Sequence, residues 1–106
     1  MQPLKPGKLV RDKRVPIIER QTGKKPAFHI LSREQKGEAL RVKLCEEAKE
    51  VRGARMADLE EEIADVQEVL DAVISHYNLS AENIARIRAV KADEKGVFRF
   101  GDYLYD

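Results

Sequence analysis

Apolar residues recur at helical spacing through the middle of the chain, and this pattern predicts two long helices. The first is expected from Ser32 to about Arg52, because Ser32 and Gln35 have the spacing of a capping-box helix start. Its apolar residues fall on one stripe: Leu40, Leu44 and Val51. Gly53 interrupts the run.

The second long helix is expected from Asp58 to Asn78, since Asp58 and Glu61 repeat the capping-box spacing. Its apolar seam has heptad regularity and comprises Leu59, Ile63, Val66, Leu70, Val73 and Tyr77. A turn of about five residues joins the two helices, so they are expected to be antiparallel neighbours.

Shorter elements are expected on either side of this hairpin. Residues 9–21 fit a short helix with Pro16 in its first turn. Its inward-facing residues would be Val10, Ile17 and Ile18. Ser80 is a suitable N-cap for a third helix, which Gly96 ends. The apolar positions of that helix are Ile84, Ile87 and Val90. The tail, residues 97–106, alternates aromatic with polar residues and fits either a strand or an ordered extension.

Taken together, the pattern predicts one all-α domain over residues 1–106, an antiparallel helical hairpin plus a short third helix. The length of 106 residues leaves little room for a second domain. Val69, Ala72 and Ile74 widen the apolar seam beyond what one small chain covers. We therefore expect a homo-oligomer, most simply a twofold dimer whose paired hairpins complete a four-helix bundle.

Composition narrows the classes of protein. Hydrophobic residues make up 42%, too many for a disordered chain. Twenty Lys and Arg nearly balance 19 Asp and Glu, so we expect no general binding to nucleic acid polymers. The sequence contains no apolar run of 18 residues, so no membrane span is expected. The single cysteine, Cys45, excludes an intrachain disulfide, and with no secretory signal visible we expect a cytoplasmic protein.

Two acidic motifs carry the candidate chemistry: Glu46-Glu47-Ala48-Lys49-Glu50 on the first long helix and Glu62-Ile63-Ala64-Asp65 on the second. In each motif, two acids three positions apart lie on neighbouring turns, with Cβ atoms about 5–6 Å apart. A helical projection places Glu47 within the apolar stripe of its helix and Glu62 beside the seam of the next. Across the turn, Glu50 matches Glu62 in height, and Glu47 matches Asp65.

Four carboxylates are thereby predicted to converge beside apolar residues: Glu47, Glu50, Glu62 and Asp65. Burying unpaired like charges costs several kcal/mol for each group, so protons or a cation must neutralise them. The donor atoms are all oxygens, which favours Mg²⁺, or Mn²⁺ as a substitute, over zinc. Basic residues predominate in the first 25 positions, and a basic arm facing an acidic helix pair suits a metal-bound polyanion.

These motifs resemble those of the MazG-like, all-α nucleoside triphosphate pyrophosphatase superfamily, whose hallmark is EExxE followed by ExxD on the next helix. The opening segment from Lys8 to Lys13, KLVRDK, is similar to the start of the phosphoribosyl-ATP pyrophosphohydrolase-like branch. The segment from Lys91 to Phe98 resembles the ending of that branch, with Val97 where relatives often have glycine. The spacing of 11 residues between the two acidic motifs is slightly shorter than is usual in the family.

The resemblance implies that Glu47, Glu50, Glu62 and Asp65 bind Mg²⁺, with Glu46 in support. It also implies cleavage of a nucleoside triphosphate between its α and β phosphates, giving a monophosphate and pyrophosphate. Glu46 or Glu47, if free of the metal, is a candidate to take the proton of the attacking water. The candidate phosphate contacts are basic: Lys8, Arg11, Lys13, Lys91 and Lys95.

Two other interpretations remain open at this level. One keeps the chemistry and takes phosphoribosyl-ATP, an intermediate of histidine biosynthesis, as the substrate. The other is a ligand-free helical dimerisation or antitoxin-like module, in which the acids are only surface residues. That module predicts that Glu47→Ala is neutral or stabilising and that Mg²⁺ leaves the melting temperature unchanged.

Overall fold

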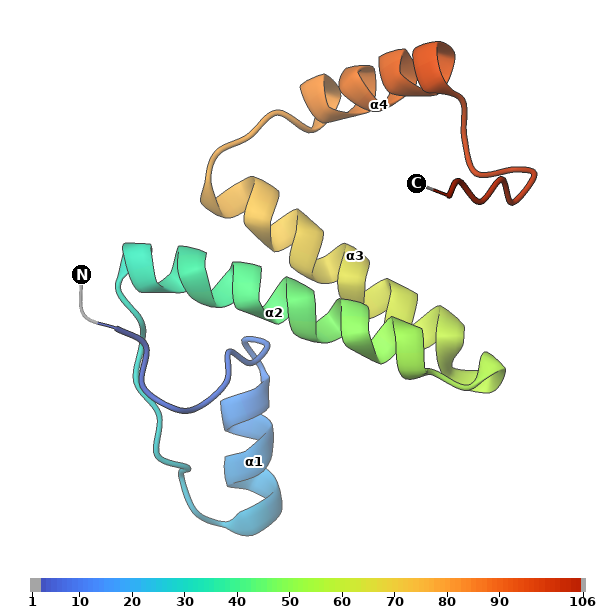
Figure 1. The fold of residues 1–106 in the computed structure, drawn as a ribbon. Helices are drawn as coiled ribbons and strands as arrows, with labels where there is room; N and C mark the ends of the chain where they lie inside the picture. Colours follow the sequence, from blue (N-terminus) through green and yellow to red (C-terminus); the bar gives the residue numbers. More distant parts are fainter. Residues whose placement is uncertain (1–2, 106) are drawn as a thin grey trace.

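The computed structural model describes residues 3–105, and within them all regular structure is helical. In chain order the elements are α1 (Arg14–Thr22), α2 (Arg33–Gly53), the short 3-10 helix η1 (Met56–Asp58), α3 (Leu59–His76) and α4 (Ala81–Lys95). Figure 1 shows α2 and α3 side by side as an antiparallel hairpin, with α1 and α4 on opposite sides of it. The predicted all-α fold is confirmed. No helix in residues 3–105 is long and apolar enough to span a membrane.

The start of α2 is the predicted capping box. Ser32 Oγ accepts a hydrogen bond from the Gln35 backbone N–H at 3.2 Å. The Ser32 backbone N–H in turn donates to Gln35 Oε1 at 3.2 Å. These bonds satisfy two backbone donors that a helix start leaves unpaired. Gly53 is the last residue of α2, and five residues separate it from Leu59, the first residue of α3.

The second predicted capping box, Asp58 with Glu61, is wrong. Asp58 makes no side-chain cap to the backbone of α3, because its carboxylate instead accepts from Arg55 Nε at 2.9 Å. The 3-10 turn η1 is a second reason, because it leaves Asp58 at φ −105° and ψ −6°. An N-cap residue normally has an extended backbone, from which its side chain reaches the N–H groups of the first turn.

The face that α3 packs against α2 also differs from the prediction. The most buried residue of α3 is Val69, on the stripe that also carries Asp65 and Ala72. The predicted seam is partly covered, since Leu59, Val66 and Val73 are half-buried, whereas Ile63 and Leu70 are exposed. Apolar residues occupy two neighbouring stripes of α3, of which the one with Val69 is the more deeply buried. Ile63 and Leu70, on the other stripe, are left facing outward.

The beginning of α2 packs closely against the end of α3. Ala39 and Leu40 are buried there with Gly37. A Cβ atom at position 37 would lie 2.5 Å from Tyr77 Oη, which explains a glycine inside the helix. Arg33 adds a tie across the hairpin by donating to the His76 carbonyl oxygen at 3.0 Å. This bond satisfies one of the unpaired carbonyls at the end of α3.

The end of α3 is fixed by its backbone, close to where Asn78 was expected to end it. Asn78 has a left-handed φ of 53°, and the Leu79 N–H donates to the Ile74 carbonyl at 2.9 Å. This is the hydrogen bond of a Schellman helix end. Ser80 then caps α4 as predicted, because its Oγ accepts from the Asn83 N–H at 3.0 Å. Two defined helix ends thus meet within a few residues and set the direction in which α4 leaves the hairpin.

The two end helices are peripheral. The first begins at Arg14 rather than residue 9, so Pro16 does fall in its first turn, while Val10 precedes the helix and is exposed instead of inward. Ile17 and Ile18 are half-buried. At the other end, α4 stops at Gly96 as predicted. Residues 97–105 form no strand and their large apolar side chains are exposed.

Candidate metal centre

Three of the four predicted metal ligands meet across the hairpin. Glu47 of α2 and Glu62 and Asp65 of α3 each offer a carboxylate oxygen, and the three oxygens lie within 4.8 Å of one another. All three residues are half-buried. The antiparallel packing brings them together because Glu47 lies about two turns before the end of α2 and Asp65 about two turns after the start of α3. We refer to these three residues as the acidic triad.

The fourth predicted ligand, Glu50, is exposed and lies outside the triad. It is nonetheless close enough to act on Glu62 electrostatically. Desolvation by burial raises the pKa of Glu62 above its ordinary value, and the negative charges of Asp65, Glu50, Glu47 and Glu61 raise it further. Since both causes disfavour the ionised carboxylate, a cation at this point of the hairpin would relieve them.

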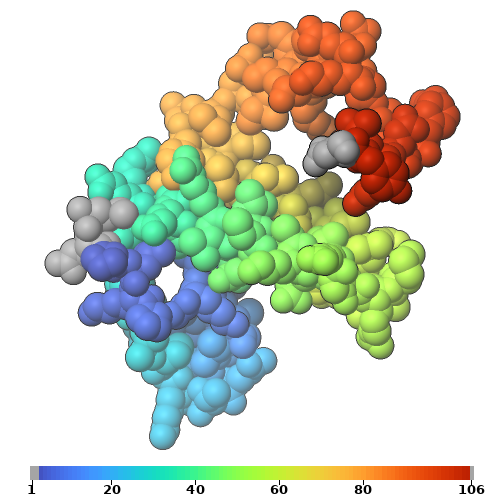
Figure 2. Space-filling view, in the orientation of Figure 1, coloured from blue at the N-terminus to red at the C-terminus, as the bar shows by residue number. Residues whose placement is uncertain are grey.

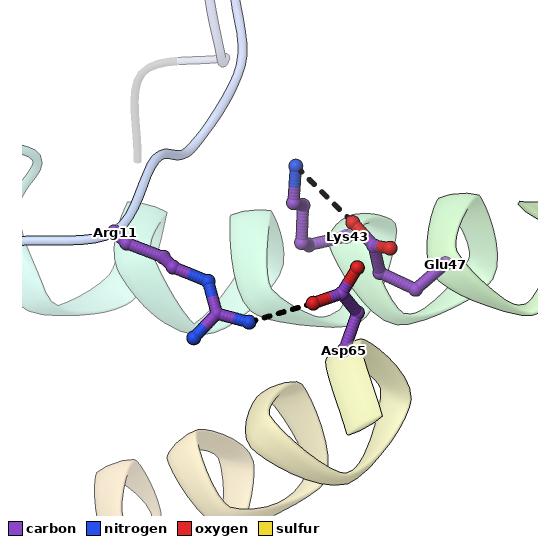
Figure 3. A network of polar contacts seen from close by, with 4 residues as sticks. All are labelled: Arg11, Lys43, Glu47 and Asp65. Atoms are coloured by element: carbon purple, nitrogen blue, oxygen red, sulfur yellow. Dashed lines mark hydrogen bonds and ion pairs between the residues drawn. The ribbon is translucent and has the colours of Figure 1, made fainter. Parts of the chain in front are cut away.

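Two basic side chains already contact the triad (Figure 3). The Arg11 guanidinium donates to Asp65 Oδ1 at 2.8 Å, reaching from the segment before α1. Lys43, one turn before Glu47 on α2, lies 3.4 Å from Glu47 Oε1. Both partners of this second pair are well shielded, with side-chain exposures of 24% for Lys43 and 14% for Glu47.

The triad, Glu50, Arg11 and Lys43 together carry an excess of negative charge. Four carboxylates face one guanidinium and one ammonium group, which leaves a net charge of −2 when all are ionised. One divalent cation balances that charge. The donors are carboxylate oxygens, the ligand type preferred by hard cations such as Mg²⁺, Mn²⁺ and Ca²⁺. The residues present therefore fit a divalent metal ion.

The structure distributes the other predicted site residues unevenly. Arg11 reaches the triad. Glu46 directly precedes Glu47 on α2, but it is exposed and does not belong to the triad. Lys8 and Lys13 are exposed on the segment that carries Arg11. Lys91 and Lys95 lie on α4, which stands apart from the hairpin (Figure 1).

Sequence reasoning missed Lys43. A signal was available, because Lys43 and Glu47 are four positions apart and therefore neighbours on a helix surface. In this pair Lys precedes Glu, which is the weaker order for an isolated helix. The short distance is therefore better explained by the concentrated negative charge of the triad than by local helix stability.

Comparison of the chain with models of protein families, with curated proteins and with solved structures finds no match.

Proposed function

We propose that this chain is a Mg²⁺-dependent nucleoside triphosphate pyrophosphohydrolase, which cleaves between the α and β phosphates and releases a monophosphate and pyrophosphate. The observation that carries the proposal is the acidic triad, three carboxylate oxygens within 4.8 Å of one another on two antiparallel helices. The order of the acidic motifs supports it, because their resemblance to the MazG-like superfamily implies this reaction.

Glu47, Glu62 and Asp65 would hold the metal ion, with Glu50 beside them. When bound, Mg²⁺ neutralises phosphate charge and lowers the pKa of a coordinated water. The triad alone does not distinguish Mg²⁺ from another hard cation. Mg²⁺ is proposed because it commonly joins one or two protein carboxylates to substrate phosphates.

The chain's own side chains supply the remaining functions. Arg11 is anchored at the triad by Asp65, and its guanidinium would donate two parallel hydrogen bonds to phosphate oxygens once substrate arrives. Lys43 lies at the same site and balances Glu47. Glu46, which is not a member of the triad, would take the proton of the attacking water. Phosphate contacts from Lys8, Lys13, Lys91 and Lys95 remain predictions of the resemblance.

The decisive experiment is a panel of ribo- and deoxyribonucleoside triphosphates with Mg²⁺, assayed for both pyrophosphate and monophosphate. We expect equal amounts of the two products, and no activity after Mg²⁺ is chelated. Phosphoribosyl-ATP belongs in the panel, because preferred cleavage of that compound would identify the alternative substrate. Release of orthophosphate and a diphosphate would contradict cleavage at the α–β bond.

Matched variants of α3 tie the activity to the site. Glu62→Gln removes a triad carboxylate and is expected to abolish activity. Glu68→Gln removes an exposed carboxylate of the same helix and is expected to leave activity within about twofold of the parent, as is usual for surface substitutions with small energetic effects. Equal activity in the two variants would show that the triad is not the catalytic site.

A further inference from the structure

The chain exposes much more surface than a compact protein of its size. Its accessible surface is 9851 Å², whereas a folded monomer of 12.1 kDa exposes about 6,000 Å². The radius of gyration is 17.8 Å, against about 13 Å for a compact chain of this length. The chain thus exposes about 3,800 Å² more than a compact monomer would. This excess is enough to supply the roughly 1,000–2,500 Å² that each partner buries in a large obligate dimer.

Much of this surface is apolar and lies in two separate places. The first is the outer face of α3, formed by Ile63 and Leu70, which are each 42% exposed. The second is the arm, residues 79–105, which comprises α4 and the segment after it. The exposed apolar side chains of the arm include Leu79, Ile87, Val90, Phe98, Phe100 and Leu104. Figure 2 shows α4, in orange, standing out from the hairpin.

Within one chain these two surfaces do not cover each other. Asn78 in its left-handed conformation, the bond from Leu79 to Ile74 and the Ser80 cap together define the junction between α3 and α4. From that junction α4 runs away from the hairpin, and within residues 3–105 it forms no extensive packing contact with another helix. The outer face of α3 and the arm are thus two unpartnered apolar surfaces on the same chain.

The charges around the two surfaces are complementary. Helix α3 carries six acids and no Lys or Arg, and Glu60 and Asp71 border its outer face. Arg88, Lys91 and Lys95 lie along one edge of the apolar stripe of α4, while one acid, Glu94, lies within the stripe between Ile87 and Val90. An arm laid along the outer face of α3 would therefore place basic residues beside acidic ones. Three basic residues and one acid of α4 would then meet the acidic face, whereas direct contact of two α3 outer faces would bring together acids alone.

We propose that two copies of this chain form a twofold dimer in which the arm of each covers the outer face of α3 of the other. The contact is the same in both directions, as a twofold axis requires, and two such contacts close the assembly. The arm exchange is independent of the catalytic assignment, because none of the acidic triad belongs to either surface. In this dimer the arm, rather than the hairpin of the second chain, covers the outer face of α3.

Photo-crosslinking in mixed dimers tests the exchange directly. A benzophenone amino acid replaces Phe98 in the full-length chain, and ¹⁴N and ¹⁵N chains are unfolded together, refolded and irradiated. Cross-linked peptides are expected to join the arm to α3, with about half pairing a ¹⁴N with a ¹⁵N peptide, the ratio for random mixing. Cross-links to α3 that carry only one isotope would mean that each arm folds onto its own hairpin and would overturn the proposal. The same probe at Ile30, on the exposed segment before α2, serves as the control.

Two charge substitutions on α3 give an independent test. Leu70→Asp places a charge on the outer face, and Ser75→Asp places the same charge about 140° around the helix, on the solvated face. By light scattering at micromolar concentration, Leu70→Asp is expected to halve the mass of the particle and Ser75→Asp to leave it unchanged. An unchanged dimer in both variants would exclude the outer face as the interface. A parent protein that is monomeric at this concentration would exclude the dimer itself. If Leu70→Asp does not fold, the isotope experiment still decides.

Discussion

At the scale of single residues, Glu62 is the acid whose surroundings most disfavour its ionised form. Its carboxylate is half-buried on α3, and this burial, together with the negative charges of four neighbouring acids, raises its pKa above the ordinary value of 4.5. A folded-state pKa above the unfolded one means that ionised Glu62 destabilises the metal-free protein. That destabilisation is absent well below pH 4.5 and grows as the pH rises through the folded-state pKa.

Glu62→Gln is therefore expected to raise the melting temperature of the metal-free protein at neutral pH. The difference from the parent should shrink as the pH falls toward 4.5, because protonated Glu62 and Gln are then alike in charge. Thermal unfolding in a chelator at several pH values measures this difference. Glu68→Gln, on the solvated face of the same helix, is expected to show no comparable trend. A Glu62→Gln protein less stable than its parent at neutral pH would contradict the electrostatic account.

Arg11 is expected to act on metal and substrate in opposite directions. It occupies Asp65 Oδ1 in the absence of a ligand, so it competes with a cation for that oxygen. Arg11 is 64% exposed, and ion pairs with so accessible a partner contribute about 0.2–1 kcal/mol. Arg11→Ala should therefore tighten Mg²⁺ binding about two- to fivefold without nucleotide, while lowering kcat/KM by roughly ten- to a hundredfold if Arg11 contacts phosphate.

Calorimetric titration with Mg²⁺ and steady-state kinetics separate these two effects. Arg20→Ala, which removes an exposed arginine of α1, is the matched control and should change neither. Weaker Mg²⁺ binding in Arg11→Ala would show that Arg11 organises the triad rather than competing for it.

At the scale of elements, the hairpin depends on a close approach at Gly37. Alanine is normally favoured over glycine inside a helix by up to about 1 kcal/mol. Here the added Cβ would lie 2.5 Å from Tyr77 Oη and 2.9 Å from His76 Nε2, so both rings must shift. The Tyr77 ring also stacks under Arg41 and meets His76 edge-on, which limits its freedom. We expect Gly37→Ala to destabilise the fold by about 1–2 kcal/mol, the lower range for overpacking.

Chemical denaturation checks this value against Gly53→Ala. Gly53 closes the same helix with open space around it, so its substitution should be neutral or slightly stabilising. In a Tyr77→Leu background, the cost of Gly37→Ala should fall, because the nearest atom is gone. A stabilising Gly37→Ala would mean that the rings move aside freely and that the close approach does not constrain the hairpin.

The elements also show which features of the fold the sequence predicts. Ser32 and Ser80 cap their helices as expected, because an N-cap depends on residues within one turn of it. Asp58 has the same local pattern, but its carboxylate accepts a hydrogen bond from Arg55, a residue outside the capping motif. Periodicity identified the apolar residues of α3, yet it does not indicate which of two neighbouring stripes meets α2. Burial of Val69 rather than Leu70 depends on the three-dimensional packing.

The candidate site divides in the same way. Glu47, Glu62 and Asp65 were predictable because a short turn between two helices fixes their relative height. Glu50 lies beyond the triad because it is one turn further round and along α2, at an exposed position. The contact between Arg11 and Asp65 joins residues 54 positions apart and depends on the path of an irregular segment. No local pattern predicts such a path.

At the scale of the whole molecule, metal binding and folding stability are linked. A cation that binds the folded triad and not the unfolded chain stabilises by mass action, about 2.7 kcal/mol at 100 times its dissociation constant. Mg²⁺ or Mn²⁺ is therefore expected to raise the melting temperature, by an amount that increases with concentration. Glu62→Gln should remove most of this shift and Glu68→Gln should retain it. An unchanged melting temperature at millimolar Mg²⁺, with or without a non-hydrolysable nucleotide, would refute the metal site and favour a helical module without a ligand.

The separation of α4 from the hairpin has a consequence for amide hydrogen exchange. An isolated helix of 15 residues is only marginally stable in water, so α4 without a partner should exchange its amides through local unfolding. The amides of α2 and α3 should be slower, because the hairpin must open before they exchange. In the proposed dimer the partner chain covers α4, and dilution separates the two chains. Dilution should therefore speed amide exchange in α4 far more than in the hairpin. Mass spectrometry of the exchanged peptides would then show directly that the order of α4 depends on protein concentration.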